Sequence, residues 1–488
     1  MKKIVQVLAA VALLNCMTPN TYAQQDKNKG LMFTTSSNEA LSFFTDGLKY
    51  YDLGENTKAR EFLQKAIKQD PSFSIAYVHL ATLSATPQEF VSNLDKAKEN
   101  LSGTNEWEKL LYDYTETYLS DNVDKRFSIG QQMTKSFPSS ARACNYLGQA
   151  FDNRNDYANA RKCYQKALSL EPQWPGGYIS LATSYLFADP KDFKEAEKTA
   201  SKLVSIAPAN ASYILLGDTY RAQNNLQKAE EMYSKAIKED AQLPEGYYKR
   251  GHAFTFQGQY DKARPDYENA GKLDIMPTGA REYVAFTYLY QNDAAKALES
   301  LQNDIQNVTP TLDATQMTSF KFELLTTSAM IAMHNRNSKK LAEIVNMLQP
   351  LAEDLGNRIG TPEGKLGQKA NILYWEGMVD VLNDDFDAAK QKAEAVKATL
   401  EPVNNPLKLD GYNFLLGCMA MKQKDFKTAV SYLEKTSKFD VYEQYCLAKA
   451  YEANGQKDKA AAINKYISDY NFNNIGYALI RSELKKKM

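Results

Sequence analysis

The chain has 488 residues, a length that suggests about three domains of ordinary size. Its 59 basic side chains are balanced by 59 acidic ones. This balance gives no electrostatic case for binding to nucleic acid, which depends on a basic excess or a basic stripe. The one basic run, Lys485–Lys487, closes a predicted terminal helix, where cations suit the helix dipole.

The first 23 residues have the pattern of a signal peptide. Lys2 and Lys3 supply positive charge, and Ile4–Leu14 is a largely apolar run, much shorter than the ~20 residues of a membrane-spanning helix. Thr21-Tyr22-Ala23 then places small residues at the cleavage positions, which predicts cleavage before Gln24. We therefore expect a bacterial protein that is periplasmic or secreted after cleavage, with residues 24–37 as a flexible N-terminus.

Cys16 leaves a second interpretation of the same segment. Leu13-Leu14-Asn15-Cys16 resembles the motif at which bacterial lipoproteins are cleaved and lipidated, which would place the protein at the outer membrane. Asn15, however, stands where that motif has Gly, Ala or Ser. The sequence therefore favours ordinary cleavage over lipidation.

From residue 38 onwards the chain repeats one small unit. Eight alanines each lie twelve residues after a glycine or an alanine, and Ala229, Ala263 and Ala297 follow one another at intervals of 34 residues. Glycines scattered by chance would not hold that register. The alanines are Ala59, Ala160, Ala229, Ala263, Ala297, Ala389, Ala429 and Ala460.

Each unit has the pattern of a helix, a short polar turn and a second helix. In the unit around Gly217, Tyr220 lies nine residues before Ala229, and Tyr233 lies four residues after it. Small residues at this spacing let two helix axes cross closely, and the aromatic side chains fill the space around them. Proline cannot continue a helix, so Pro71, Pro172 and Pro208 are expected to end the second helices of their repeats.

This pattern resembles the tetratricopeptide repeat family, most clearly from Ala141 to Trp174 and again from Asn210 onwards. The resemblance implies an all-α fold, an α-solenoid of helix-turn-helix repeats that forms a right-handed superhelix. We expect an N-terminal array at 38–309 and a C-terminal array at 368–488.

Between the two arrays, residues 310–367 are expected to form a longer helix pair and a hinge loop. Three glycines and Pro362 place the loop at 357–367. The last helix, Ile475–Leu484, is expected to cap the final repeat, because the end of a solenoid must cover its last apolar face.

The resemblance also implies that function lies in the groove lined by the first helices. Helical phase, counted from the small residue, selects the side chains that should point into the superhelix. They are aromatic or of mixed charge, which favours an extended peptide or a partner helix. The candidate partner-binding residues are Asp218, Arg221, Tyr248, His252, Phe256, Glu282, Phe286 and Tyr290.

Two further interpretations concern this groove. A slightly different superhelical phase would instead bury some of these side chains against neighbouring repeats, whereas the favoured phase makes His252 an exposed contact residue. The peptide clamp best known in the family grips a C-terminal carboxylate with Lys, Asn and Arg. The corresponding positions are Asn145, Gln149 and Ser180, so that clamp is not supported.

Catalytic and metal-binding patterns are missing from the sequence. The three histidines, His79, His252 and His334, fall in separate helix pairs, and no zinc, acyl-transfer, phosphate-loop or dinucleotide motif occurs. No cofactor and no metal are therefore expected. Two cysteine pairs could meet, either oxidised or as buried thiols: Cys144 with Cys163, and Cys418 with Cys446.

The sequence favours a non-catalytic scaffold or adaptor of the bacterial cell envelope that binds a protein or peptide, with no nucleic acid and no transmembrane segment. The alternative is a carbohydrate-binding outer-membrane protein of the starch-utilisation type. That type exposes aromatic platforms on long insertions, whereas the turns here are short and the tryptophans number three. An enzyme is the third class.

Overall fold

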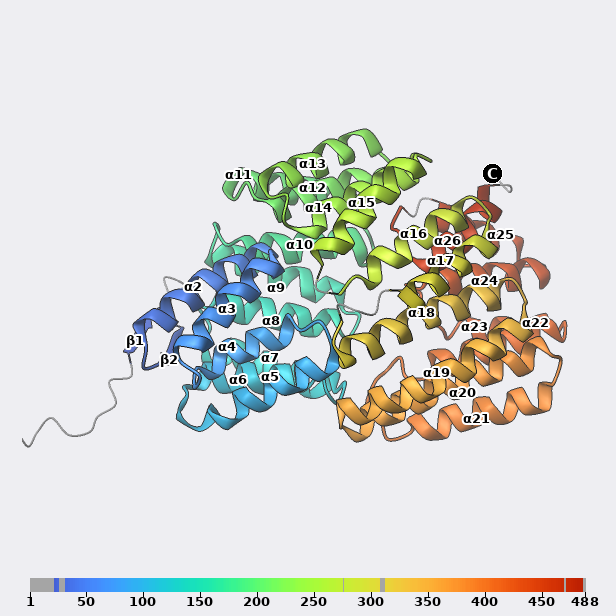
Figure 1. Cartoon of the computed structure of the whole chain (residues 1–488), viewed down its shortest axis with the longest axis horizontal. Helices are drawn as coiled ribbons and strands as arrows, with labels where there is room; N and C mark the ends of the chain where they lie inside the picture. The colour runs from blue at the N-terminus through green and yellow to red at the C-terminus, as the bar shows by residue number, and fades with distance from the viewer. Residues whose placement is uncertain (1–21, 26–30, 275, 308–311, 469–470, 486–488) are drawn as a thin grey trace, which may run out of the picture.

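The computed structural model describes residues 22–25, 31–274, 276–307, 312–468 and 471–485. Residues 1–21, which carry most of the signal-peptide pattern, lie outside this part of the chain. The described residues form a two-stranded sheet followed by α-helices labelled α2 to α26 (Figure 1). The all-α solenoid expected from the repeats is confirmed.

The helices follow one another as pairs, as the repeat pattern predicts. The first pairs are α2 (Asn38–Leu53), α3 (Asn56–Gln69), α4 (Ser74–Thr82), α5 (Pro87–Glu99), α6 (Glu106–Glu116), α7 (Val123–Ser136), α8 (Ala141–Asp152) and α9 (Tyr157–Leu170). The middle pairs are α10 (Pro175–Phe187), α11 (Phe193–Ile206), α12 (Asn210–Ala222), α13 (Leu226–Glu239), α14 (Pro244–Phe256), α15 (Tyr260–Leu273), α16 (Thr278–Tyr290) and α17 (Ala294–Asn307). The last helices are α18 (Ala314–His334), α19 (Ser338–Ile359), α20 (Pro362–Leu382), α21 (Phe386–Leu400), α22 (Asp410–Lys422), α23 (Phe426–Leu433), α24 (Val441–Ala453), α25 (Lys457–Ser468) and α26 (Ile475–Lys485).

Small residues hold the two helices of a repeat close together. A Cβ atom added at Gly217 on α12 would lie 2.4 Å from Cε1 of Tyr233 on α13, and one at Gly148 would lie equally close to Tyr164. The tyrosine ring therefore occupies the volume that a larger side chain would need. The second helices α3, α9 and α11 each end two residues before the proline that was expected to stop them.

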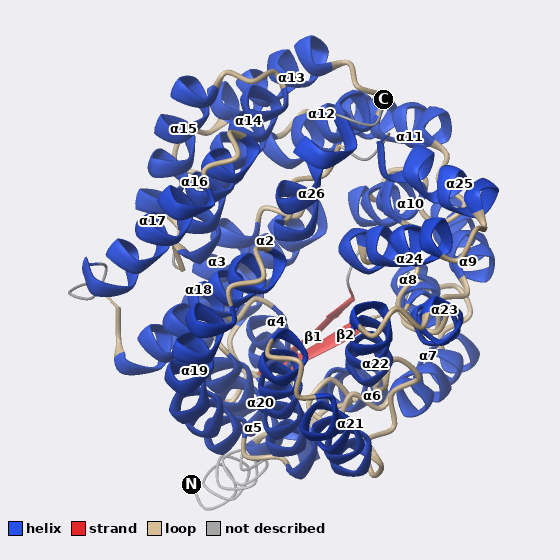
Figure 2. Ribbon diagram, turned by 90° about the vertical axis from the view of Figure 1, so that its right-hand side faces the viewer, coloured by secondary structure: helices blue, strands red, loops and turns tan. Residues whose placement is uncertain are grey.

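The helix pairs wind into a superhelix whose later part lies against its earlier part. Figure 2 shows the helices arranged in a ring, with α26 on its inner side. The hydroxyl of Thr361 donates to the backbone oxygen of Leu119 at 3.2 Å, and the rings of Tyr157 and Phe439 are 5.4 Å apart. Repeats far apart in the sequence thus become neighbours.

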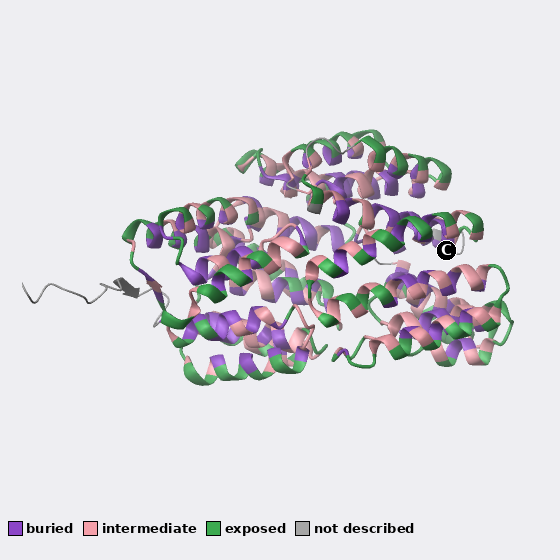
Figure 3. Cartoon of the chain, turned by 60° about the horizontal axis from the view of Figure 1, so that its bottom comes forward, coloured by how far each residue is buried: buried purple, intermediate pink, exposed green. Residues whose placement is uncertain are grey.

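The apolar core runs along the array as a chain of clusters. One cluster extends from α14 to α26, another covers the first repeats, and smaller ones lie between them. Figure 3 shows buried positions recurring along the helices with exposed positions on their outer sides. Each repeat therefore depends on its neighbours for burial, as a solenoid requires.

The hinge loop expected at 357–367 is wrong. The helix α19 continues to Ile359, Gly360 ends it in a left-handed conformation with φ of 75°, and α20 begins at Pro362. The hydroxyl of Thr361 accepts a hydrogen bond from the backbone N–H of Gly364. Thr361-Pro362 is a helix start signal, an N-cap followed by proline in the first turn, and it overrides the glycines that follow.

The flexible N-terminus expected at 24–37 is also wrong for the residues described there. The strand β1 (Tyr22–Gln25) pairs antiparallel with β2 (Met32–Thr35). Leu31 and Phe33 are buried, and the backbone N–H of Thr34 donates to Glu108 Oε1 at 2.9 Å. Alternating burial of Leu31 and Phe33 anchors this strand on the first repeats.

We expect Gly217→Ala to destabilise the protein by about 1 to 3 kcal/mol, because the added methyl group overlaps the Tyr233 ring. Chemical denaturation followed by circular dichroism measures this change. Gly364 is a poor control, since a Cβ there would lie 2.5 Å from Ile359 Cγ2. A Cβ atom added at Gly367 on α20 would meet no other atom within 4 Å, so Gly367→Ala should be neutral or stabilising. Equal unfolding curves for Gly217→Ala and the wild type would contradict the repeat packing.

Candidate binding face

The sequence-predicted residues lie together on α12, α14 and α16, and we call this surface the middle groove. It is not an open surface. Five of its side chains are less than a tenth exposed, and three are half-buried. The buried ones are Asp218, Arg221, His252, Phe256 and Phe286, and the half-buried ones are Tyr248, Glu282 and Tyr290.

Part of the middle groove is covered by residues 471–485, which we call the C-terminal segment and which contacts Arg221, His252, Phe256 and Tyr290. Phe472 of this segment is only 6% exposed and belongs to the apolar cluster formed by α10, α11 and α12. Its ring lies 4.6 Å from the ring of Phe187 and 5.0 Å from the guanidinium carbon of Arg221. The expectation that His252 is an exposed contact residue is therefore wrong, since its side chain is only 5% exposed.

Asn473 makes the most specific contacts in the middle groove. The hydroxyl of Tyr290 donates to its Oδ1 at 2.7 Å. Its Nδ2 lies 3.2 Å from both the Tyr267 hydroxyl and Nδ1 of His252, each of which can accept a hydrogen bond. Two residues earlier, Nδ2 of Asn471 donates to Asn224 Oδ1 at 3.0 Å. The segment is thus held by side chains from three successive repeats.

The helix α26 completes this contact. It was expected to cap the last repeat, and it does pack against α24 and α25, but it also packs against α16 and α18. Ile480 is fully buried, and Arg481 lies over the ring of Phe256 at 4.6 Å. The cap therefore joins the end of the chain to its middle repeats.

A charged cluster lies beneath the middle groove. The carboxylate of Asp218 is within 2.8 Å of Lys249 Nζ and 2.9 Å of Arg221 Nη2, and the Tyr233 hydroxyl donates to it at 2.7 Å. Burial alone would raise the pKa of Asp218, but the two cations and the hydrogen bonds outweigh burial and lower the pKa to about 2. Asp218 and Arg221 therefore serve the fold as a buried pair.

The protonation state of His252 follows from its surroundings. Burial lowers its pKa well below the usual value, and the positive charges of Arg221 and Lys249 lower it further. The imidazole is therefore neutral at physiological pH. Its Nδ1 lies 2.9 Å from the Tyr267 hydroxyl, so the ring is part of the network that holds Asn473.

A second part of the concave side is open. A cavity of about 250 Å³, which we call the N-terminal hollow, is lined by side chains from α2, α4, α8 and α10 and by the residue before α10. They include Tyr51, Asp52, Arg142, Asn145, Gln149 and Ser180, together with Trp174. Asn145, Gln149 and Ser180 are the positions that correspond to the family's peptide clamp, and the structure brings these three together in the hollow.

Arg142 is the charged residue of the N-terminal hollow that helical phase alone could have found. It lies three residues before Asn145 and seven before Gln149, on the same face of α8. Its guanidinium donates to Asp52 on α2 through both terminal nitrogens, one of them at 2.6 Å. This pair leaves the hollow neutral and polar, and the clamp for a terminal carboxylate remains unsupported.

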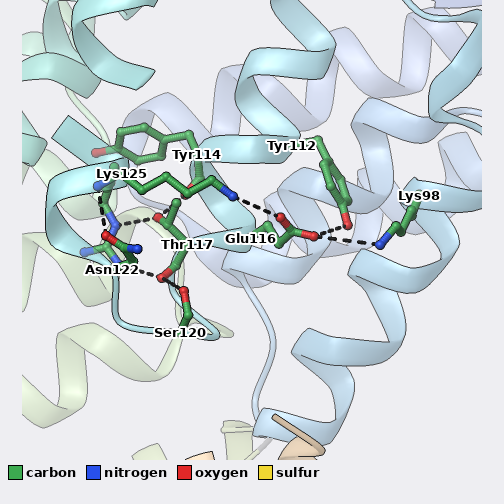
Figure 4. A network of polar contacts seen from close by, with 9 residues as sticks. Lys98, Tyr112, Tyr114, Glu116, Thr117, Ser120, Asn122 and Lys125 are labelled. Carbon is green, nitrogen blue, oxygen red and sulfur yellow. Dashed lines mark hydrogen bonds and ion pairs between the residues drawn. The ribbon is translucent and has the colours of Figure 1, made fainter. Parts of the chain in front are cut away.

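A larger cavity of about 610 Å³ lies where the two parts of the superhelix meet. Tyr118 and Leu119 line it from one side, and Leu400 and Val403 line it from the other. Figure 4 shows the network that holds the turn after α6, in which Glu116 accepts from the Tyr112 hydroxyl at 3.1 Å. This cavity belongs to the junction between helix layers.

Profile models of one family match four segments of the chain. Models described as tetratricopeptide repeat match residues 141–174, and residues 47–73 and 244–274, and one described as TPR repeat matches residues 217–255. In three of these segments a glycine of the first helix meets a tyrosine ring of the second, and in residues 47–73 Gly47 meets Leu63 instead. The chain is a tetratricopeptide repeat protein.

Relatives of this repeat protein share only part of their length with it. Superkiller protein 3 of Schizosaccharomyces pombe is 25% identical over 209 residues, which cover 41% of this chain and 15% of that protein. Human protein O-mannosyl-transferase TMTC3 is 21% identical over 201 residues, which cover 38% of this chain and 22% of that protein. The matches thus leave most of each relative without a counterpart here.

Solved structures resemble the repeat protein at low identity. The structure of the APC/C hetero-tetramer Cut9-Hcn1 gives a TM-score of 0.43 at 15% identity, covering 99% of this chain and 81% of that one. Yeast Tom70 gives a TM-score of 0.44 at 15% identity, covering 89% and 93%. The assignment to the family rests on the repeat matches rather than on these overlaps.

The carbohydrate-binding alternative finds no support in these comparisons or in the geometry. All three tryptophans, Trp107, Trp174 and Trp375, are at most 5% exposed and form no aromatic platform. Within the described part of the chain, no helix combines the length and the apolar run that a membrane crossing needs, and no group of His, Cys, Asp or Glu is placed to hold a metal.

The two cysteine pairs singled out in the sequence contain free thiols in the described structure. Burial raises the pKa of the Cys163 thiol to about 11, and the neighbouring Cys144 contributes to this shift. Burial likewise raises the pKa of Cys446 to about 12. The thiols are therefore protonated and weakly nucleophilic at neutral pH.

We expect the buried Glu282 to make the protein less stable as pH rises. Burial raises its pKa from 4.5 to about 7, although the Thr327 hydroxyl donates to its carboxylate and opposes that shift. Because the pKa of Glu282 is higher in the folded state than in the unfolded state, protonation of this carboxyl stabilises the fold at low pH. That contribution to stability is lost as pH rises from about 4.5 through about 7.

Glu282→Gln removes this titration. Its melting temperature should exceed that of the wild type at about pH 8 and differ little at about pH 5. The exposed Glu299 on α17 supplies the control Glu299→Gln, which should shift the melting temperature equally at both pH values. A Glu282→Gln effect that is the same at both pH values would contradict the assignment.

Proposed function

We propose that this tetratricopeptide repeat protein is a non-catalytic scaffold that binds a partner polypeptide on the concave side of its superhelix. The observation that carries the proposal is the C-terminal segment, which lies along the middle groove and is held by side chains of α14 and α16 and of the turn after α12. A surface that holds one extended segment in this way has the chemistry to bind a polypeptide.

The N-terminal hollow is the open part of this face. It carries an aromatic wall from Tyr51 and Tyr146, with the amide of Gln149 and the hydroxyl of Ser180 beside it. Amide and hydroxyl groups pair with the N–H and C=O groups of an extended peptide, and aromatic rings cover its side chains. The neutral Arg142–Asp52 pair favours an uncharged stretch of polypeptide over a terminal carboxylate.

The proposal places this scaffold in the bacterial cell envelope, outside the cytoplasm. The support is the signal-peptide pattern of residues 1–23, most of which lies outside the described residues. The free thiols in the described structure are compatible with either side of a membrane, so this part of the proposal depends on the sequence pattern alone.

Blocking the N-terminal hollow should abolish partner binding without unfolding the chain. Gln149→Trp fills the cavity from α8, whereas Lys202→Trp on the outer face of α11 leaves it open. Affinity capture from native envelope extract, followed by mass spectrometry, should recover a polypeptide with the wild type and Lys202→Trp but not with Gln149→Trp. Equal recovery with both variants, with unchanged melting curves, would contradict binding in the hollow.

Export is tested by the N-terminus of the mature protein. Expressed in a bacterium with its full sequence, the protein should be recovered from the periplasm or the medium with Gln24 as its first residue. N-terminal sequencing and intact mass give this result directly. A cytoplasmic chain that retains Met1, or an acylated chain that begins at Cys16, would contradict the expectation.

A further inference from the structure

The C-terminal segment makes contacts that a cap does not need. A cap must only cover the apolar face of the last repeat with something polar outside. Here the four residues before α26, Asn471–Asn474, are not helical, and they leave the last repeat to reach α12 and α14. Asn473 contacts His252, which lies 221 residues earlier in the chain.

Recognition of Phe472 combines an apolar cluster with a cation. Leu186, Leu215 and Ala222 belong to the cluster in which its ring is buried, and the Arg221 guanidinium lies over the ring. Arg221 is itself fixed by Asp218, so the cation is held in place by the fold. A large flat side chain fits this site, and a small one would leave the cluster partly empty.

Recognition of Asn473 uses both ends of its amide. The oxygen accepts from Tyr290, and the nitrogen faces the Tyr267 hydroxyl and the neutral His252. Tyr267 is fully buried and also contacts the Thr255 hydroxyl, so its position is set by its own repeat. An apolar side chain in place of Asn473 would leave the Tyr290 hydroxyl without its acceptor.

We propose that the middle groove is a peptide-recognition site for an extended segment in which phenylalanine is followed by asparagine, and that the C-terminal segment occupies this site in competition with a partner that carries the same pair. This inference rests on the proposed function but concerns a different surface from the N-terminal hollow. Binding at the hollow and binding at the middle groove are therefore tested separately.

The experiment uses the full chain and a labelled synthetic peptide with the sequence of residues 468–478. Phe472→Ala combined with Asn473→Ala weakens the resident segment while leaving α26 in place. Fluorescence anisotropy should show that this double variant binds the peptide about tenfold or more tightly than the wild type, whose groove is filled. A peptide with the same two residues changed to alanine should not bind.

A groove variant identifies where the peptide binds. Tyr290→Phe, added to the double variant, removes the hydroxyl that donates to the asparagine and should weaken peptide binding by about tenfold. Tyr247→Phe is the matched control. Tyr247 lies on α14, one of the groove helices, but outside the contacts between the groove and the segment, so this change should leave peptide binding unchanged.

Several results would overturn the inference. A folded double variant that binds the peptide no better than the wild type shows that the groove does not recognise this segment in trans. Equal binding of the alanine-substituted peptide shows that recognition is not specific. If light scattering finds a wild-type dimer that becomes a monomer in the double variant, the segment comes from a second copy instead.

Loss of the fold in the double variant would not end the test. Asn473→Ala alone removes the amide contacts and leaves Phe472 buried, which costs the fold less. This variant should also bind the peptide more tightly than the wild type. A folded Asn473→Ala variant without that gain would overturn the inference in the same way.

Discussion

The close contact between a glycine on one helix and a large side chain on the next, a tyrosine ring in the middle repeats and a leucine at Gly47 and Gly417, sets the geometry of these repeats. At Gly217 the ring of Tyr233 occupies the space that any Cβ would need, and the same contact recurs at Gly148 and Gly251. Because the helices of these pairs are held close together in this way, successive pairs stack on one another, and the array becomes a superhelix. The later repeats then return to lie against the earlier ones, and the C-terminal segment reaches the middle groove.

The concave side therefore has one part that the chain itself covers and one part that is open. The middle groove is filled by the chain itself and is built on a buried charged cluster, in which one carboxylate is shared by two cations. The N-terminal hollow is open and neutral, because Arg142 is paired with Asp52. A partner that enters the hollow meets a preformed surface, whereas a partner at the middle groove must first displace Phe472 and Asn473.

The sequence predicted the helix pairs and the side on which the candidate residues lie, because small residues and aromatic residues at fixed spacing are local signals. It could not predict burial of His252 or Arg221, since the covering segment is more than 200 residues away in the chain and carries no repeat pattern. Asn471–Asn474 reads as an ordinary polar end of the last repeat, and only the superhelical return brings it to α12 and α14.

The two wrong expectations, a hinge loop at 357–367 and a flexible N-terminus at 24–37, have local causes. Three glycines between 357 and 367 suggested a loop, but Thr361-Pro362 begins a helix that tolerates two of them. The strand β2, which contains Phe33 and follows Leu31, is too brief to stand out by alternation, and it is fixed by contacts with Glu108 on α6. Arg142 lies on the same face of α8 as Asn145 and Gln149, so helical phase predicts its place in the hollow, but its pairing with Asp52 on α2 depends on the tertiary fold.

Hydrogen exchange of the wild-type chain, read by mass spectrometry, tests most directly whether the C-terminal segment occupies the middle groove. Peptides that cover residues 471–485 should exchange as slowly as those that cover α16, because the segment is buried against that helix. Their protection should fall together when Phe472 is changed to alanine. Fast exchange of residues 471–485 in the wild type, with α12, α14 and α16 still protected, would contradict the account.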